Sequence, residues 1–465
     1  MACFRSKLWW MSQRMGDKGG DVPHETQFLL VESRGAGGGE DAAYVVFLPL
    51  VEGAFRASLQ GGAGDELELC VESGDADTRA ASFERALFVG AAESDPFAAI
   101  SGAVAAAKSA LRTFRVRAEK KLPGIVDYFG WCTWDAFYQD VTQEGVETGL
   151  RSLIAGGAPP KFVIIDDGWQ SVGTDKSATD TDEPAGEDKP PLLSRLTGIK
   201  ENSKFQNVDD PAAGIKTVVR AAKEEYGLKY VYVWHAITGY WGGVRPGEPG
   251  TEHYRSSMQF PKVSPGVMEN EPGMKTDVLT VQGLGLVHPR AVYRFYDELH
   301  AYLAAAGVDG VKVDVQCILE TLGAGHGGRV QLTRQYHQAL DASIAKNFPE
   351  SVARERCMGS RRRGMGGHCM GARTRHETDS DGRSREEDAG QPRSLPTAQL
   401  HRAPAHRNSA AHLLRSLSPT PVPTPAPPPH PPPGLPRLAA TNASRPSSPF
   451  RSSIAASTRP CSSTR

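Results

Sequence analysis

The residues best suited to chemistry lie in the segment Gly310-Val-Lys-Val-Asp-Val-Gln-Cys317. Valines alternate there with Lys312, Asp314 and Gln316, so the pattern predicts a strand with its polar side chains on one face. An ammonium group beside a carboxylate favours the ionised carboxylate, which suits a nucleophile better than a proton donor. A structural ion pair is the alternative that this motif alone leaves open.

A second candidate is the pair of adjacent carboxylates in Asp166-Asp-Gly-Trp169, which follows the apolar segment Phe162-Val-Ile-Ile165. Two carboxylates at the end of a strand can bind sugar hydroxyls, ligate a metal or cap the next helix. The aromatic ring beside them favours carbohydrate, because a flat ring stacks on the apolar face of a sugar.

Both groups belong to a strand–loop–helix pattern that begins near residue 125 and occurs four times. The expected strands are 126–131, 162–165, 230–234 and 311–315, and the expected helices lie near 143–155, 211–226, 289–306 and 329–347. Alternating helices and nearly continuous apolar strands predict a parallel β/α architecture. A β/α barrel keeps its active site at the C-terminal ends of its strands, which is where the polar residues gather.

The predicted fold class is therefore α/β, a partial (β/α)8 TIM barrel of about four β/α units. Residues 1–95 alternate short apolar runs with Gly-rich turns, which predicts a partial antiparallel β-sandwich domain. Residues 96–122 should form a linker helix, which Pro123-Gly124 ends. Residues 123–350 then hold the N-terminal half of the barrel.

The remaining segment, residues 351–465, has the composition of a disordered tail unrelated to the rest of the chain. It contains 18 Arg, no Lys, 7 acidic residues and 17 of the 34 prolines, so its net charge is +11 and that of residues 1–350 is −12. So little apolar surface cannot offset the entropy of ordering. The run Arg361-Arg-Arg363 could bind nucleic acid, but no aromatic residues are interleaved with it, and a solvated tail is the expectation.

Seven cysteines lie far apart with no CxxC pair, which predicts reduced thiols and a cytoplasmic protein, with a plastid as the alternative compartment. The first residues lack the apolar core of a signal peptide, and no run of 18 apolar residues occurs, so no membrane span is expected. No spacing typical of zinc ligands is present, and no metal or organic cofactor is implied.

Longer motifs occur in a fixed order: Phe129-Gly-Trp-Cys-Thr-Trp-Asp-Ala-Phe137, Ile165-Asp-Asp-Gly-Trp-Gln-Ser171, Val233-Trp-His-Ala236 with Gly239-Tyr-Trp-Gly-Gly243, and Gly310-Val-Lys-Val-Asp-Val315. Together they resemble plant raffinose synthases, seed imbibition proteins and alkaline α-galactosidases, a group similar to glycoside hydrolase family 36. Phe4-Arg-Ser-Lys-Leu-Trp-Trp-Met11 resembles the family's N-terminal β-domain. The resemblance covers roughly residues 3–350.

The resemblance implies a retaining mechanism on an α-galactoside, with Asp314 as the nucleophile that forms a covalent galactosyl-enzyme. It implies that Lys312 holds a galactose hydroxyl and keeps Asp314 charged. Asp166 and Asp167 would bind the galactose 4- and 6-hydroxyls. The other implied sugar contacts are four tryptophans and a histidine: Trp134, Trp169, Trp234, Trp241 and His235.

The general acid/base is the part of the family pattern that this sequence lacks. A retaining enzyme needs a second carboxyl about 5–5.5 Å from the nucleophile. The family supplies it from an Arg-Ala-Ser-Asp-Asp-Phe-like strand after the Lys-x-Asp motif, and no such segment occurs here. The acids between Asp379 and Asp388 lie in the hydrophilic tail and are not expected to take this role. We therefore expect a chain truncated at both ends and inactive as it stands.

Three functions remain open. The first is galactosyl transfer from galactinol to sucrose, which makes raffinose by a double displacement. The second is an alkaline α-galactosidase that hydrolyses raffinose-family oligosaccharides, and it differs only in whether sucrose or water reaches the covalent intermediate. The third is a non-catalytic sugar-binding fragment. In each case the expected partners are small sugars, with neither nucleic acid nor a membrane.

Overall fold

The computed structural model describes residues 1–33, 43–92, 94–120, 122–175, 192–206, 210 and 212–348. The tail expected at residues 351–465, with its late acidic residues, lies outside the described residues. None of the helices in the described part of the chain is long and apolar enough to cross a membrane.

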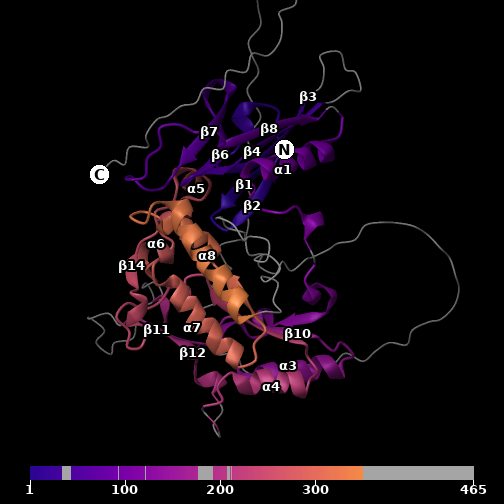
Figure 1. The fold of residues 1–465 in the computed structure, drawn as a ribbon, viewed down its shortest axis with the longest axis vertical. Helices are drawn as coiled ribbons and strands as arrows, with labels where there is room; N and C mark the ends of the chain where they lie inside the picture. Colours follow the sequence, from indigo (N-terminus) through magenta and orange to yellow (C-terminus); the bar gives the residue numbers. More distant parts are fainter. Residues whose placement is uncertain are drawn as a thin grey trace, which may run out of the picture. The chain divides into compact units, whose positions relative to one another are not determined.

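The N-terminal region forms an antiparallel sheet, which contains eight strands among the described residues (Figure 1). Its order is β2-β1-β3-β4-β8, and β6 connects β3 to β5 and β7. The strands are β1 (Ala2–Lys7), β2 (Trp10–Arg14), β3 (Thr26–Ser33), β4 (Ala43–Pro49), β5 (Val51–Glu52), β6 (Phe55–Gly61), β7 (Leu67–Glu72) and β8 (Leu87–Ala92). The antiparallel pairing agrees with the alternation of short apolar runs and turns in this part of the sequence.

The first helix, α1 (Pro96–Leu111), packs on β4 and β8 through alanines that meet Val46 in a buried cluster. Asp95 caps its start by accepting hydrogen bonds from two amides of the first turn. The helix is shorter than the sequence pattern predicts, because Arg112 adopts a left-handed conformation with φ of 54°. The basic residues up to Lys120 therefore lie outside the α-helix.

The second region contains a parallel sheet made of β9 (Gly130–Cys132), β10 (Phe162–Ile165), β13 (Tyr230–Ala236) and β16 (Gly310–Asp314). These strands are neighbours in the order in which they occur in the chain. The predicted α/β architecture is thus confirmed, and the described residues provide four parallel strands. The first strand is shorter than expected, since Gly124–Asp127 form a 3-10 helix instead.

The helices that accompany these strands are α3 (Gln143–Ala155), α4 (Lys216–Glu224), α7 (Val292–Ala305) and α8 (Arg329–Asn347). In Figure 1, α3 lies beside α4, and α7 lies beside α8. Their apolar faces share one hydrophobic core with fully buried strand residues such as Val163, Val231 and Val233. Because side chains alternate along a strand, the intervening positions point to the opposite face of the sheet.

Two antiparallel strand pairs and three short helices follow the strand ends. The pairs are β11 (Gln170–Thr174) with β12 (Ser194–Glu201), and β14 (Ser257–Gln259) with β15 (Leu284–Leu286). The short helices are α2 (Trp134–Phe137), α5 (Pro265–Asn270) and α6 (Val278–Gln282). These insertions follow the C-terminal ends of the parallel strands, which is the edge that carries the predicted site residues.

Candidate active site

The acids predicted from the sequence come together because three neighbouring parallel strands end at one edge. Asp166 and Asp167 directly follow β10, and Asp314 is the last residue of β16. Between them runs β13, whose Trp234 pairs in register with Lys312. In a parallel sheet these C-terminal ends open toward the same side, so the carboxylates and the ammonium can share one ligand.

Asp166 is buried, with 2% of its surface exposed. Its Oδ2 accepts hydrogen bonds from Lys312 Nζ at 2.6 Å and from the Cys132 thiol at 3.0 Å, and its Oδ1 accepts the amide of Asp167 at 2.9 Å. Burial lowers the pKa of Lys312, but the Asp166 carboxylate raises it more, so the ammonium stays charged. The sequence placed this lysine beside Asp314, whereas its ion pair is with Asp166.

Asp167 is also buried, at 1% exposed. Its Oδ2 accepts hydrogen bonds from Gln139 Nε2 at 2.9 Å and Trp241 Nε1 at 2.8 Å. Its Oδ1 is buried and accepts no hydrogen bond of acceptable geometry, although Tyr240 interacts with the same carboxylate. A buried acceptor without a donor is costly, so a hydroxyl group from a ligand would stabilise this site.

Asp314 differs from the other two acids because its side chain is exposed. Its Oδ2 accepts a hydrogen bond from Trp234 Nε1 at 3.2 Å, and its Oδ1 accepts the amide of Val315 at 2.7 Å. An exposed carboxylate held by two donors at the edge of a binding site has the accessibility that a nucleophile requires.

The four predicted tryptophans have different environments. Trp234 and Trp241 stack with their ring centroids 6.1 Å apart and donate to Asp314 and Asp167 respectively, so they belong to the acid cluster. Trp169 is completely buried and donates to the carbonyl of Trp234, which leaves no free ring face for a sugar. Trp134 is half-buried and packs edge-on against Tyr138.

His235 lies on the other face of β13, away from the acids. It is fully buried, and its Nε2 lies 3.2 Å from Nε2 of His300 on α7. Burial lowers the pKa of His235 to about 4, so its ring is neutral at ordinary pH. The structure therefore does not bring His235 to the sugar contacts that the resemblance implied.

Three residues of the cluster were not singled out from the sequence: Cys132, Gln139 and Tyr240. Cys132 ends β9 and so occupies the same edge as Asp166, a position that the strand pattern could have indicated. Tyr240 precedes Trp241 in the quoted glycine-rich motif. Gln139 follows the short helix α2, and nothing in its local sequence indicates that it faces Asp167.

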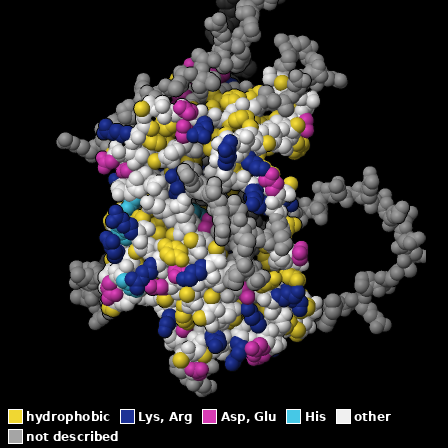
Figure 2. Space-filling view, viewed as in Figure 1, with side chains coloured by type: hydrophobic (Ala, Val, Ile, Leu, Met, Phe, Trp, Pro, Cys, Tyr) yellow, Lys and Arg dark blue, Asp and Glu magenta, His cyan; other side chains and the backbone are white. Residues whose placement is uncertain are grey.

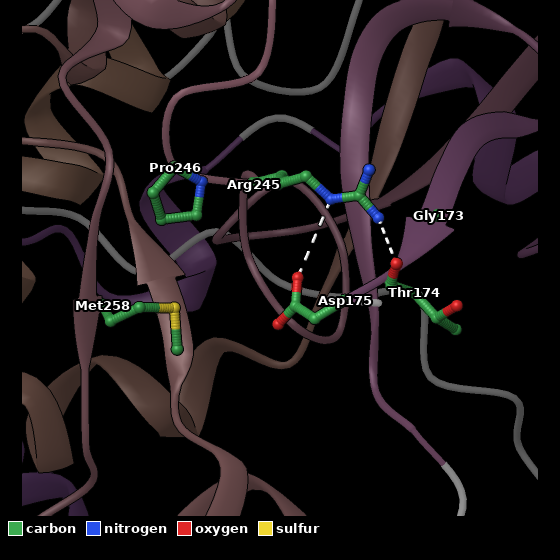
Figure 3. A pocket seen from close by; sticks show the side chains of 6 residues that line it. All are labelled: Gly173, Thr174, Asp175, Arg245, Pro246 and Met258. Atoms are coloured by element: carbon green, nitrogen blue, oxygen red, sulfur yellow. Dashed lines mark hydrogen bonds and ion pairs between the residues drawn. The ribbon is translucent and has the colours of Figure 1, made fainter. Parts of the chain in front are cut away.

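A separate cavity of about 710 Å³ lies beside β11 and β14 rather than at the acids. It is lined by Gly173, Thr174, Asp175, Arg245, Pro246 and Met258, and Figure 3 shows Arg245 directed toward Asp175 and Thr174. The Arg245 guanidinium is already bound to Asp175, Glu248 and the carbonyl of Thr174. We therefore place the candidate site at the acid cluster, where two buried carboxylates, an exposed carboxylate and the Lys312 ammonium lie together.

The described residues contain no group of three or more His, Cys, Asp or Glu side chains that could hold a metal ion. On the face drawn in Figure 2, basic and acidic side chains are interspersed over the described surface. Neither observation assigns a partner, and the chemistry of the site rests on the acids, Lys312 and the two stacked tryptophans.

Comparison with known proteins gives one family match. Residues 1–365 match the family model described as raffinose synthase or seed imbibition protein Sip1. The chain is 64% identical to the probable galactinol–sucrose galactosyltransferase 6 of Arabidopsis thaliana over 361 residues, which are 76% of this chain and 47% of that protein. It is 40% identical to the galactinol–sucrose galactosyltransferase of Pisum sativum, covering 74% of this chain and 44% of that protein.

Among solved structures, the α-galactosidase from Lactobacillus brevis matches with a TM-score of 0.40 and 14% identity, covering 72% of this chain and 40% of that one. The chain spans about half the length of the curated relatives that it matches.

Proposed function

Because the chain belongs to the raffinose synthase or seed imbibition protein Sip1 family, we propose that its acid cluster binds the galactosyl group of an α-galactoside. The observation that carries the proposal is the pairing of two buried carboxylates with Lys312, next to an exposed Asp314. In this proposal the Asp167 carboxylate accepts a hydrogen bond from a sugar hydroxyl, and the Lys312 ammonium, whose side chain is 25% exposed, donates one.

In the proposed reaction Asp314 attacks the anomeric carbon of the donor. A bond forms between a carboxylate oxygen and this carbon, while the bond to the leaving oxygen breaks. That oxygen takes a proton from an acid outside the described residues or from solvent. The hydrogen bonds from Trp234 and Val315 keep the Asp314 carboxylate in position for the attack. An acceptor hydroxyl then attacks the anomeric carbon with inversion, gives up its proton to the conjugate base of that acid or to solvent, and releases the Asp314 carboxylate, so the two steps together retain the configuration.

The donor and acceptor that we propose are galactinol and sucrose, with raffinose as the product. Two relatives carry galactinol–sucrose galactosyltransferase in their names, which supports this choice. The four parallel strands in sequential order would form the first half of a (β/α)8 barrel. The described cysteines are free thiols, which fits our proposal of a reducing compartment, the cytosol or a plastid.

A non-catalytic sugar-binding role is the second candidate, and one observation favours it. After β16 the described residues contain only two carboxylates, Glu320 and Asp341. Glu320 is bound by arginines, and Asp341 lies on α8, so neither has the position of a general acid that faces Asp314. Binding of galactose without turnover is the expected behaviour of this candidate.

The test is to incubate the full chain with galactinol and sucrose, and separately with 4-nitrophenyl α-galactoside, and to measure galactose binding by calorimetry. Raffinose formation that disappears in Asp314→Asn would establish the transferase, and nitrophenol release alone would establish a hydrolase. Galactose binding without either product would establish the binding role. If galactose does not bind and no product forms, the proposed function is wrong.

A further inference from the structure

The residue that follows the proposed nucleophile has a strained backbone. Val315 has φ of 58° and ψ of 28°, the left-handed region, and only 9% of its surface is exposed. A β-branched residue adopts this region rarely, because its side chain collides with its own backbone. Such a conformation persists only when the surrounding structure imposes it, and it occurs preferentially at functional sites.

This strained turn determines where the Asp314 carboxylate points. The amide of Val315 donates to Asp314 Oδ1 at 2.7 Å, so a change in the Val315 backbone would move that hydrogen bond. On the other side the carbonyl of Asp314 accepts the amide of Ile237 at 2.8 Å. The Asp314 carboxylate is therefore oriented by a turn whose left-handed backbone conformation valine normally avoids.

The segment after the turn is a 3-10 helix, Gln316–Leu322, that is held by ion pairs from a distant part of the sequence. Glu320 lies in this helix. It pairs with Arg5 on β1, with Arg56 on β6 at 3.6 Å, and with Arg329 at the start of α8 at 4.0 Å. The N-terminal sheet thus contacts the residues that follow the nucleophile strand.

These groups form what we call the Glu320 cluster: Arg5, Glu25, Arg56, Glu72, Glu320 and Arg329. Arg56 makes a two-bond pair with Glu25, each bond at 2.8 Å, and also binds Glu72 at 2.6 Å. Three arginines balance three glutamates, and three of the six residues, Glu25, Arg56 and Arg329, are buried. Burial disfavours the charge on Arg56, but Glu320 and Glu25 outweigh it and raise its pKa.

We propose that Glu320 is a positioning residue, which holds the 3-10 helix so that Val315 keeps its left-handed conformation and Asp314 keeps its orientation. The assignment of Asp314 rests on the proposed function, whereas the control of the Val315 turn does not. A merely structural role for Glu320 predicts a loss of overall stability. A positioning role predicts faster amide hydrogen exchange mainly in residues 314–322. This increase should be smaller when the strain at Val315 is removed.

Glycine at position 315 separates the two roles, because glycine adopts the left-handed region without steric cost. With glycine at position 315, the ion pairs of Glu320 are no longer needed to keep the turn in the left-handed conformation. The four variants are therefore wild type, Glu320→Gln, Val315→Gly and the double variant. Arg5→Gln, which removes one partner of Glu320 from the sheet, serves as a second test if Glu320→Gln does not fold.

The first measurement is amide hydrogen exchange of the peptide that covers residues 314–322 in the full chain. We expect Glu320→Gln and Arg5→Gln to accelerate this exchange about tenfold, a change within the range of backbone strain. The same Glu320→Gln change in the Val315→Gly background should accelerate it less than threefold. The matched control Glu119→Gln, which breaks an exposed pair with Lys108, should have no effect there.

The second measurement compares two probes of the site: galactose, and a galactose-configured iminosugar whose cation pairs with the Asp314 carboxylate. Glu320→Gln should weaken iminosugar binding about tenfold and galactose binding less than twofold. Unchanged exchange in both Glu320→Gln and Arg5→Gln, or equal acceleration with valine and glycine at position 315, would overturn the proposal. If wild type binds neither probe, the proposed function fails, and the exchange result still decides whether Glu320 controls the turn.

Discussion

Lys312 Nζ lies 2.6 Å from Asp166 Oδ2, although these residues belong to β16 and the end of β10, with β13 between them. The side chain of Asp166 is 3% exposed and that of Lys312 is 25% exposed. Solvent therefore reaches the ammonium of Lys312 but hardly reaches the carboxylate of Asp166. A sugar hydroxyl that reaches Lys312 meets a cation whose position is fixed before binding.

Replacing Lys312 with Met should weaken galactose binding and destabilise the fold. Methionine fills the space, but it leaves Asp166 Oδ2 with the Cys132 thiol as its remaining side-chain donor. An enclosed acceptor that loses such a donor costs about 1–3 kcal/mol, so the Kd for galactose should rise about tenfold and the Tm should fall by a few degrees. Calorimetry measures both. The control Lys346→Met breaks an exposed pair and should change neither, and an unaltered Kd in Lys312→Met would contradict this role.

The position of the acids could be predicted from the sequence, but the pairing between them could not. Apolar runs ahead of Asp166, Asp167 and Asp314 mark strand ends, and parallel strands end at one edge. The partner of Lys312 was expected to be Asp314, its neighbour on the same face of the same strand. The ion pair forms across β13 instead, and only the three-dimensional distance between the strands decides that choice.

The burial of individual side chains could be predicted from the sequence only in part, as Trp169 and His235 illustrate. Side-chain alternation along β13 already puts His235 on the face opposite Trp234, so this signal was present in the sequence. The burial of Trp169 has no local signal, because it depends on a hydrogen bond to a carbonyl 65 residues later in the chain. The strain at Val315 could not be predicted either, since valine is a residue that normally avoids this backbone region.

The buried histidine pair should make the protein sensitive to acid. Nδ1 of His235 faces the carbonyl of Ala236, so it carries the proton, and Nε2 accepts from Nε2 of His300, whose Nδ1 then accepts from Ser343 Oγ. Burial lowers the pKa of His235 to about 4, and burial followed by the charge of His235 holds that of His300 well below 6.5. A second proton on His235 would set its Nε2–H against the Nε2–H of His300.

Between about pH 6.5 and pH 4 the unfolded chain binds protons that the folded chain does not, so the free energy of unfolding falls as the pH falls. His235 alone accounts for on the order of 3 kcal/mol over this range. Urea unfolding at pH 7.5, 6 and 5 measures the slope. His300→Asn should reduce it, whereas His24→Asn, a histidine outside the pair, should not. A slope that is the same in wild type and His300→Asn would refute the prediction.

Cys132 should react slowly with alkylating reagents at neutral pH. Burial, followed by its hydrogen bond to Asp166, raises the pKa of this thiol to about 11. Because the thiolate is the reactive form, its rate with iodoacetamide should be about 100-fold below that of an ordinary thiol and should rise tenfold per pH unit up to about pH 11. Mass spectrometry of the Cys132 peptide gives the rate. Asp166→Asn should accelerate it, and a plateau near pH 9 in wild type would contradict the assignment.

Gly243 should be essential for the position of Trp241, and Gly247 provides a matched control for this. Both have a left-handed backbone, with φ of 75° and 69°, so alanine at either position meets similar strain. A Cβ at Gly243 would lie 2.1 Å from the carbonyl oxygen of Gly285, whereas a Cβ at Gly247 would have no neighbour within 4 Å. The difference in the free energy of unfolding between the two alanine variants therefore measures the cost of the contact with the Gly285 backbone. Gly243→Ala should lower the free energy of unfolding by about 1–3 kcal/mol more than Gly247→Ala, as expected for overpacking.

Only Gly243→Ala should also weaken galactose binding, because the segment it displaces carries the indole that donates to Asp167 Oδ2. Thermal unfolding and calorimetric titration of the two variants measure the two effects. A folded Gly243→Ala protein that binds galactose like Gly247→Ala would show that Asp167 does not need Trp241 for binding. If both variants lose galactose binding, backbone strain is the cause of the loss, because the contact with Gly285 exists at only one of the two positions.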